Sequence, residues 1–291
     1  MATLSQWIEG ARPRTLPAAV SPILVGTGAA YQTGHIVWAY AVLGLVVALA
    51  LQVGVNYAND YSDGIRGTDE VRVGPVRLVG QRLAQPSSVK FAAFASFGFA
   101  AVVGLALVGL SGLWVMIPIG AAAVLAAWYY TGGSRPYGYL GLGEVFVFVF
   151  FGLVATVGTM ATMTPPTAAC WWGAVGVGAL ASAILVANNL RDIPTDREHG
   201  KRTLAVRMGE RGTRAFYVAL VAVAFVVAGI VSFTAPWALL ALLAAPLVVR
   251  PMQAVLGGAT GPGLIPALAG TGRFQLAWSV LLAVGLALGR G

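Results

Sequence analysis

Long apolar runs separated by short polar segments form the pattern of this chain. Most runs approach the roughly 20 apolar residues that an α-helix needs to cross a bilayer. They predict nine spans, at residues 16–33, 37–58, 89–109, 112–131, 141–162, 168–190, 213–233, 235–250 and 272–290. The segment 251–271 is rich in glycine and proline, which indicates a loop or a broken helix. We therefore expect an all-α integral membrane protein with a single domain over residues 1–291.

The distribution of lysine and arginine predicts the orientation of these spans. With nine spans, all but one of the 18 basic residues fall on the side of the N-terminus, and only Arg290 falls on the other. Because basic residues accumulate in cytoplasmic segments, we expect the N-terminus inside and the C-terminus outside. The 10 acidic residues also lie on the inner side. That rule does not cover acids, so their position indicates a cytoplasmic-facing site that uses both signs of charge.

Composition agrees with a membrane protein. The chain is 58% hydrophobic and 10% charged, whereas a soluble domain carries about 25% charged residues. Its net charge of +8 does not indicate nucleic-acid binding, because the basic residues lie in short loops between apolar runs. The expected environment is the lipid bilayer.

Two polar clusters with a shared pattern end the second and sixth predicted spans. One reads Asn56-Tyr-Ala-Asn59-Asp60-Tyr-Ser-Asp63, and the other reads Asn188-Asn189-Leu-Arg191-Asp192-Ile-Pro-Thr-Asp196. Both contain Asn-x-x-x-Asp, and 132 residues separate them. An offset that preserves helix direction predicts a tandem repeat of four helices, over about 16–131 and 141–250, with a ninth helix appended.

The polar residues of each cluster fall at helical spacing on one face. The two sets are Asn56, Asp60 and Asp63, and Asn188, Asp192 and Asp196. Pro194 weakens the second alignment, because proline favours a helix end before Asp196. Carboxylates at membrane depth are costly unless they serve a function. Oxygen ligands on facing helices suit Mg²⁺, which also binds phosphate oxygens, and arginines flank both clusters.

These motifs resemble those of a known family. NDYSDGIRGTD at 59–69 and NNLRDIPTDREHGKRT at 188–203 resemble the two aspartate-rich motifs of the UbiA superfamily of intramembrane prenyltransferases. Four further segments resemble its MenA-type branch, the 1,4-dihydroxy-2-naphthoate polyprenyltransferases. They are RPRTLPAAVSPILVGT at 12–27, GPVRLV at 74–79, YTGGSRPYGYLGLGEVFVFVFFG at 130–152 and GKRTLAVRMG at 200–209. The resemblance covers nearly the whole chain. One departure is Asp69, which follows Asp63 by six residues, where the superfamily usually has four.

The resemblance implies a nine-helix bundle around a central cavity in the bacterial cytoplasmic membrane, with the active site facing the cytoplasm. It implies that a polyprenyl diphosphate and 1,4-dihydroxy-2-naphthoate are joined with loss of diphosphate and CO₂, giving demethylmenaquinone for menaquinone synthesis. Mg²⁺ is the expected cofactor. The expected ligands form two sets, Asp60 and Asp63 with Asn56, Asn59 and Asp69, and Asp192 and Asp196 with Asn188.

Basic residues are expected to bind the anionic groups of both substrates. Arg135 and Lys201 are expected to clamp the diphosphate, since Arg135 is the only basic residue between spans four and five. Arg191 flanks the second motif and is a further expected contact. For the acceptor carboxylate, Arg14 and Arg77 are alternatives between which the sequence does not choose.

Aromatic and acidic residues near Arg135 complete the expected site. The π faces of Tyr130, Tyr137 and Tyr139 suit an allylic cation, although an interfacial aromatic belt is an equally good interpretation. Glu144 is expected to orient an acceptor hydroxyl or the basic cluster.

Three alternatives compete with this hypothesis. A UbiA-type enzyme with another acceptor, such as 4-hydroxybenzoate or a porphyrin, would share the chemistry. A secondary transporter would also contain repeats, but its charged groups are typical of the bilayer midplane, whereas here they lie at cytoplasmic helix ends. A structural scaffold gives no reason for two matching Asn/Asp clusters.

Overall fold

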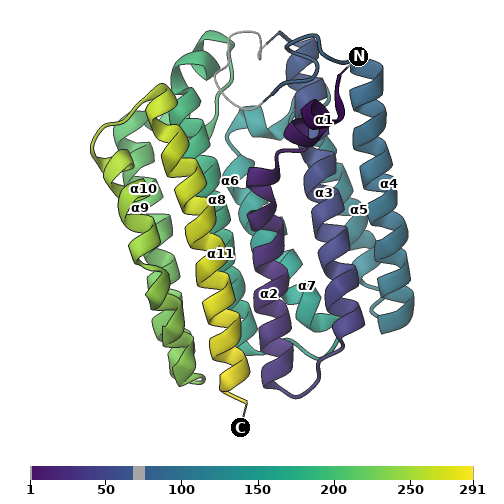
Figure 1. Ribbon diagram of the computed structural model, residues 1–291, viewed down its shortest axis with the longest axis vertical. Coiled ribbons are helices and arrows are strands. Elements are labelled where there is room, and N and C mark those ends of the chain that lie inside the picture. Colours follow the sequence, from purple (N-terminus) through teal and green to yellow (C-terminus); the bar gives the residue numbers. More distant parts are fainter. Residues whose placement is uncertain (1, 68–75, 291) are drawn as a thin grey trace.

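The computed structural model describes residues 2–67 and 76–290, and all regular structure in these two ranges is helical (Figure 1). Its first half contains α1 (Leu4–Gly10), η1 (Pro13–Thr15), α2 (Leu16–Gln32), α3 (Trp38–Ile65), α4 (Pro86–Ser111), α5 (Met116–Tyr129) and η2 (Tyr137–Leu140). A continuous rod follows, made of α6 (Gly143–Val147), η3 (Phe148–Val154) and α7 (Ala155–Ala161). The remainder contains α8 (Ala168–Glu198), α9 (Leu204–Ser232), η4 (Pro236–Ala244), α10 (Pro246–Leu256), η5 (Gly261–Leu264) and α11 (Ile265–Leu288).

The described helices confirm the membrane-protein prediction in its coarse form. Six of them are long and apolar enough to cross a bilayer, or seven if the bent pair η4–α10 is one span. α2, with 17 residues, and α5, with 14, lie at the positions of two further predicted spans but are shorter. The helical segments thus follow the predicted order.

Two helices extend beyond their predicted ends. α3 continues to Ile65, so Asp60 and Asp63 belong to the helix. α8 continues to Glu198, so the prediction that Pro194 favours a helix end before Asp196 is wrong. Pro194 is exposed, and proline removes one backbone hydrogen bond from a helix whose other bonds can persist. Asp196 is therefore held on the same rigid helix as Asn188.

The glycine- and proline-rich segment is mostly helical, although it is broken as expected. The break lies between the end of α10 at Leu256 and the start of η5 at Gly261, whereas the 51° bend between η4 and α10 falls earlier, in the predicted eighth span. After η5, α11 begins at Ile265, several residues before its predicted start. α9 also begins early, at Leu204, and contains a break at Gly209, whose φ of 69° lies in the left-handed region.

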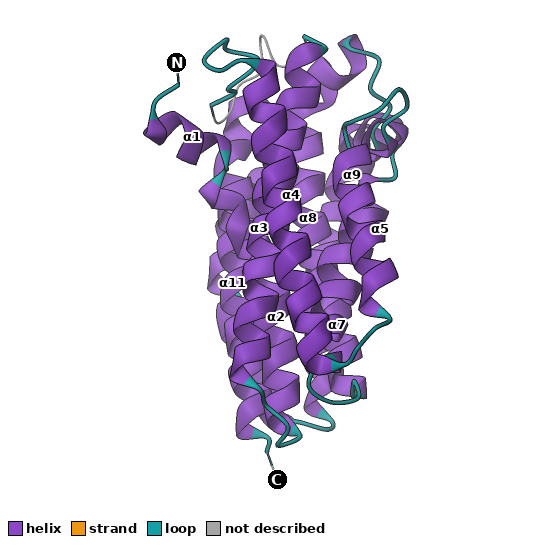
Figure 2. Cartoon of the chain, turned by 90° about the vertical axis from the view of Figure 1, so that its right-hand side faces the viewer, coloured by secondary structure: helices purple, strands orange, loops and turns teal. Residues whose placement is uncertain are grey.

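The long helices run side by side along one direction, and the short α1 lies across one end (Figures 1 and 2). The C-terminal ends of α3 and α8 lie at this same end, and α11 runs to the opposite end (Figure 1). Both Asn/Asp clusters are therefore brought to one end of the bundle.

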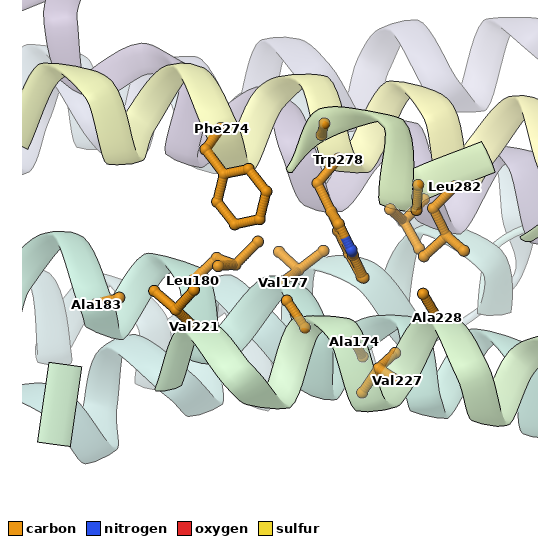
Figure 3. Close-up of a cluster of buried hydrophobic side chains, with 14 of the residues drawn as sticks. Ala174, Val177, Leu180, Ala183, Val221, Val227, Ala228, Phe274, Trp278 and Leu282 are labelled. Carbon is orange, nitrogen blue, oxygen red and sulfur yellow. The ribbon is translucent and has the colours of Figure 1, made fainter. Parts of the chain in front are cut away.

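α8 is the central helix of the bundle. In its most apolar stretch 72% of the residues are buried inside the protein, compared with 17% for α3. Its apolar side chains pack against those of α9 and α11, where Phe274 and Trp278 are completely buried (Figure 3). Gly176 permits this contact, because a Cβ there would lie 2.4 Å from the Trp278 ring. The second cluster thus stands on a helix fixed by protein on several sides.

Candidate functional site

A cavity of about 1000 Å³ runs through the bundle, lined by α2, α3, α4, α5, the 143–161 rod and α8. Most of its wall is apolar, from helix positions such as Ala48, Leu105, Ile117 and Phe150. Most of its polar residues and all of its charged ones gather where α3 and α8 end. The residues at this end are Glu9, Arg12, Arg14, Thr15, Gln52, Asn56, Asn59, Asp63, Arg77, Thr131, Asn188, Asn189, Arg191, Asp196, Lys201 and Thr203. Tyr40 near the start of α3, and Thr159 and Thr162 at the end of the rod, also line the cavity. The cavity therefore joins one charged end to a long apolar space.

Of the two described aspartates of the first motif, Asp63 is the one that lines the cavity. Its Oδ1 accepts a hydrogen bond from the Tyr139 hydroxyl at 2.5 Å and lies 3.3 Å from the Lys201 ammonium. That ammonium is 4.5 Å from the centre of the Tyr139 ring. Three chain segments thus meet at Asp63, and all three side chains border the cavity.

The end of α8 explains why Lys201 reaches this point. Gly200 has a φ of 71°, and the Lys201 N–H returns to the carbonyl of Asp196 at 2.8 Å. This left-handed glycine with a backward bond is the usual helix stop of the Schellman type. The turn places Lys201 beside its own helix end instead of in solvent, and its side chain is buried.

Asp60 has a different environment from Asp63. Its two carboxylate oxygens accept the backbone N–H groups of Leu78 at 2.7 Å and Val79 at 3.0 Å. It is completely buried and does not line the cavity. The adjacent Arg77 is buried and does line it. Asp60 therefore ties the segment that carries Arg77 to α3.

The second motif divides its carboxylates in the same way. Asp192 accepts two hydrogen bonds from the Arg191 guanidinium, at 2.7 and 2.8 Å, and one from the Asn188 amide at 3.4 Å. Asp192 does not line the cavity, whereas Asp196, Asn188 and Arg191 do. The structure thus brings Asp63 and Asp196 to the cavity and places Asp60 and Asp192 behind it.

The asparagines of the first motif bind protein groups. Asn56 donates to the Ala11 carbonyl at 2.8 Å and to the Thr15 hydroxyl at 3.0 Å, which fastens the segment before α2 to α3. Asn59 accepts a hydrogen bond from the Thr131 hydroxyl at 2.8 Å. Both asparagines still border the cavity.

The remaining predicted residues fall into four groups. Arg14 and Arg77 both line the cavity, so the structure retains both alternatives for the acceptor carboxylate. Arg135 is exposed and does not line it. Asp69 lies outside the described residues. Glu144 is buried behind the wall, where it accepts a hydrogen bond of 2.9 Å from Asn189.

The predicted tyrosines form an aromatic part of the wall. Tyr130 and Tyr137 meet edge to face with ring centres 5.5 Å apart, and Tyr137 stacks on Phe146 at 4.0 Å. Phe150 continues the row. All four residues line the cavity, which favours a role in the site over an interfacial belt.

Two of these tyrosines lie in η2, outside the spans. Burial raises the pKa of Tyr139 well above its ordinary value, and the neighbouring Asp63 carboxylate raises it further. Burial also raises the pKa of Tyr137. Both phenols therefore remain protonated at neutral pH, and Tyr139 acts as a hydrogen-bond donor.

The sequence interpretation assigned no individual role to several polar residues of the site. Gln52, Thr131 and Asn189 line the cavity, and Arg66 donates to the carbonyls of Thr131 and Gly133. Gln52 stands one helical turn before Asn56, so the same spacing argument would have found it. Thr131 carried no comparable signal, and Arg66 was expected only as one of the arginines that flank the first cluster, because their contacts join segments about 70 residues apart.

The donor set suits Mg²⁺. Within residues 2–67 and 76–290, no group of three or more His, Cys, Asp or Glu side chains could hold a metal ion by itself. Mg²⁺ commonly binds one or two carboxylates, keeps several waters and takes its other ligands from substrate phosphates. Asp63 and Asp196, with amide oxygens of the same cavity end, match that habit.

Comparison with known proteins identifies relatives along the whole chain. Residues 19–260 match the UbiA prenyltransferase family. The 1,4-dihydroxy-2-naphthoate octaprenyltransferase of Mycobacterium tuberculosis is 53% identical over 293 residues, which covers 100% of this chain and 99% of that protein. The protein of the same name from Escherichia coli is 36% identical, covering 97% and 95%.

Solved structures share the fold at low identity. A UbiA homolog from Aeropyrum pernix has a TM-score of 0.70 at 15% identity and covers 93% of this chain and 97% of that one. A UbiA homolog from Archaeoglobus fulgidus, bound to DMAPP and Mg²⁺, has a TM-score of 0.65 at 14% identity and covers 96% and 99%. The sequence matches and the common helical fold agree, and this chain belongs to the UbiA prenyltransferase family.

Proposed function

We propose that the protein transfers a polyprenyl group from polyprenyl diphosphate to 1,4-dihydroxy-2-naphthoate in menaquinone biosynthesis. The supporting observation is the cavity, which joins an end lined by carboxylates and cations to a long apolar space. That shape matches an amphiphilic donor with a charged head and a hydrocarbon tail. The choice of acceptor rests on the names of the relatives that are 53% and 36% identical.

The charged end would bind the diphosphate. Lys201 and Arg191 line it and supply positive charge, and charge-assisted bonds to phosphate oxygens are among the strong ones. Asp63 and Asp196 would hold Mg²⁺, with amide oxygens of Asn59 and Asn188 nearby on the same helices. When bound, Mg²⁺ neutralises charge on the leaving diphosphate. Asp60 would position the segment that carries Arg77, through Leu78 and Val79. Asp192 would position the Arg191 guanidinium.

The aromatic wall would stabilise the reacting carbon. As the allylic C–O bond breaks, the electron pair leaves with the diphosphate and a cation forms on the prenyl carbon. Tyr130, Tyr137 and Phe146 line the cavity as one row of aromatic rings, and aromatic rings attract cations. The apolar space limits water, which would otherwise quench the cation.

The acceptor would then complete the exchange. Arg14 or Arg77 binds its carboxylate, and the ring carbon that bears this carboxylate attacks the prenyl carbon. A new C–C bond forms between the ring and the prenyl group. The bond between the ring and the carboxylate breaks, CO₂ leaves, and the electron pair of that bond stays on the ring. That pair restores the aromatic ring, so the product is demethylmenaquinone in its hydroquinone form.

The proposal includes the placement of the chain in the membrane. Counting α2, α5 and the bent η4–α10 pair as spans gives nine, with the N-terminus and the charged cavity end in the cytoplasm. The distribution of basic residues supports this orientation. The two clusters at the ends of α3 and α8 support a tandem four-helix repeat over residues 16–131 and 141–250.

The test is an assay of the purified full chain in lipid nanodiscs with a labelled polyprenyl diphosphate. The acceptors are 1,4-dihydroxy-2-naphthoate, 4-hydroxybenzoate and a porphyrin. We expect turnover with dihydroxynaphthoate and Mg²⁺, release of CO₂ equal to product formed, and loss of turnover with EDTA. Turnover of another acceptor alone would contradict the naphthoate assignment, and full activity in EDTA would contradict the metal.

A further inference from the structure

Gln52 is a buried polar residue in the cavity wall to which the reaction described so far gives no role. It lies on α3, one turn from Asn56, and its side chain is 6% exposed. Within the part of the chain that the structure describes, its Oε1 has no hydrogen-bond partner. A buried hydrogen-bond acceptor without a partner is unfavourable. This oxygen therefore indicates a ligand with a hydrogen-bond donor.

The surrounding hydrogen bonds determine which end of the Gln52 amide remains unused. The Asn56 amide donates to the Ala11 carbonyl at 2.8 Å, so its Oδ1 must act as an acceptor. The Thr15 hydroxyl donates to the Arg12 carbonyl at 2.9 Å, so its oxygen must also accept. Gln52 Nε2 supplies both, at 3.3 and 3.0 Å.

This network consumes every donor it contains. Both amide protons of Asn56 are used, since its second bond goes to Thr15 at 3.0 Å. Both amide protons of Gln52 are used as well, and turning its amide over would direct an oxygen at two acceptors. Gln52 Oε1 is thus held as an acceptor, and only an O–H or N–H from outside the network can satisfy it.

We propose that Gln52 Oε1 accepts a hydrogen bond from a ring hydroxyl of the aromatic acceptor and so orients the ring in the cavity. This inference rests on the proposed function, because 1,4-dihydroxy-2-naphthoate offers two such hydroxyls. The position of Gln52 fits, because Thr15, which it binds, directly follows Arg14, a proposed partner of the acceptor carboxylate. One acceptor molecule would then contact the segment before α2 by its carboxylate and α3 by its hydroxyl.

The experiment compares ligands that differ by one hydroxyl. Inhibition constants against 1,4-dihydroxy-2-naphthoate are measured for 1-hydroxy-2-naphthoate, 4-hydroxy-2-naphthoate and 2-naphthoate, on the full chain in nanodiscs. In the unchanged protein, one hydroxynaphthoate should bind roughly 3- to 10-fold more tightly than 2-naphthoate, the usual worth of one hydrogen bond. In Gln52→Met that advantage should fall below about twofold, with the constant for 2-naphthoate unchanged.

Gln275→Met is the matched control. Gln275 is another buried glutamine whose Oε1 has no partner among the described residues, but it does not line the cavity. Its substitution should leave all three inhibition constants unchanged. Equal weakening of all three ligands in Gln52→Met would mean that Gln52 acts only by holding Thr15 and Asn56, and would overturn the proposal. An undiminished hydroxyl preference in Gln52→Met would overturn it too.

A second measurement needs no variant, in case Gln52→Met fails to fold. The methyl ethers of the two hydroxynaphthoates keep the oxygen but lack the proton. Against the unchanged protein, the ether of the preferred isomer should bind no better than 2-naphthoate, and equal binding of ether and alcohol would overturn the proposal. Failure of the unchanged protein to prenylate dihydroxynaphthoate is a separate result, which refutes the proposed function itself.

Discussion

Asparagine substitutions at Asp60 and Asp63 should affect different properties of the protein. Asp60 is completely buried and accepts two backbone N–H groups, from Leu78 and Val79. Hydrogen bonds to a charged group contribute about 1.5 to 3 kcal/mol each. Asparagine keeps one acceptor oxygen and turns an NH₂ toward the other N–H. We therefore expect Asp60→Asn to lower the free energy of unfolding by about 2 to 3 kcal/mol.

The catalytic effect should be indirect. Leu78 and Val79 adjoin Arg77, which lines the cavity, so loosening them should raise the KM for the acceptor. Because Asp60 does not line the cavity, the Mg²⁺ concentration for half-maximal turnover should stay within about threefold of the unchanged protein. Asp63→Asn removes a cavity carboxylate, and we expect turnover to fall by at least about 100-fold with little response to Mg²⁺.

Denaturant unfolding in mixed micelles and Mg²⁺ titration of prenyl transfer measure both effects on the same preparations. Asp63→Asn is the matched control, since it is the same substitution three residues away on the same helix. An Asp60→Asn protein with unchanged unfolding energy and a Mg²⁺ requirement raised tenfold or more would refute the reasoning, and would make Asp60 a metal ligand.

Three further predictions concern individual side chains. Arg135→Ala should leave kcat and KM within about twofold, because Arg135 is exposed away from the cavity, whereas Lys201→Ala should raise the KM for the prenyl diphosphate at least about tenfold. Since burial raises the pKa of Tyr139, its phenol stays protonated up to its ordinary value and beyond. Tyr139→Phe should therefore lower kcat about tenfold without changing the pH–rate profile between pH 6 and about 9.5, and a shifted alkaline limb would contradict this. Glu144→Gln should change the free energy of unfolding little, because it keeps the oxygen that binds Asn189. Glu144→Ala should lower that free energy by about 1 to 3 kcal/mol, measured by the same denaturant unfolding.

Helical spacing on α3 shows how far sequence reasoning about the site could go. Asn56, Asp60 and Asp63 do share a helix, as their spacing predicts. Their partners nevertheless differ, since Asn56 binds the segment before α2, Asp60 binds Leu78 and Val79, and Asp63 lies at the cavity beside Lys201. A shared face about 60° wide is too coarse to separate these directions, because each is defined by a segment distant in sequence.

Helix ends were the other weak point of the prediction. Proline and glycine have strong local preferences, and Gly200 does end α8 with a left-handed turn. Pro194 does not end it, because the helix is held by packing on several sides of α8 and not only by its backbone bonds.

The sequence by itself determined the solvent, the class of fold and the family of this protein. Long apolar runs are unfavourable in water, and basic residues accumulate on one side of a membrane. Both signals are local, and they add up along the chain. Only the tertiary structure decided which carboxylates reach the cavity. It also decided that Oε1 of Gln52 has no hydrogen-bond donor among the described residues. Those outcomes depend on hydrogen bonds between segments up to 138 residues apart, such as Lys201 to Asp63. Such bonds follow from how helices pack, and no local pattern encodes them.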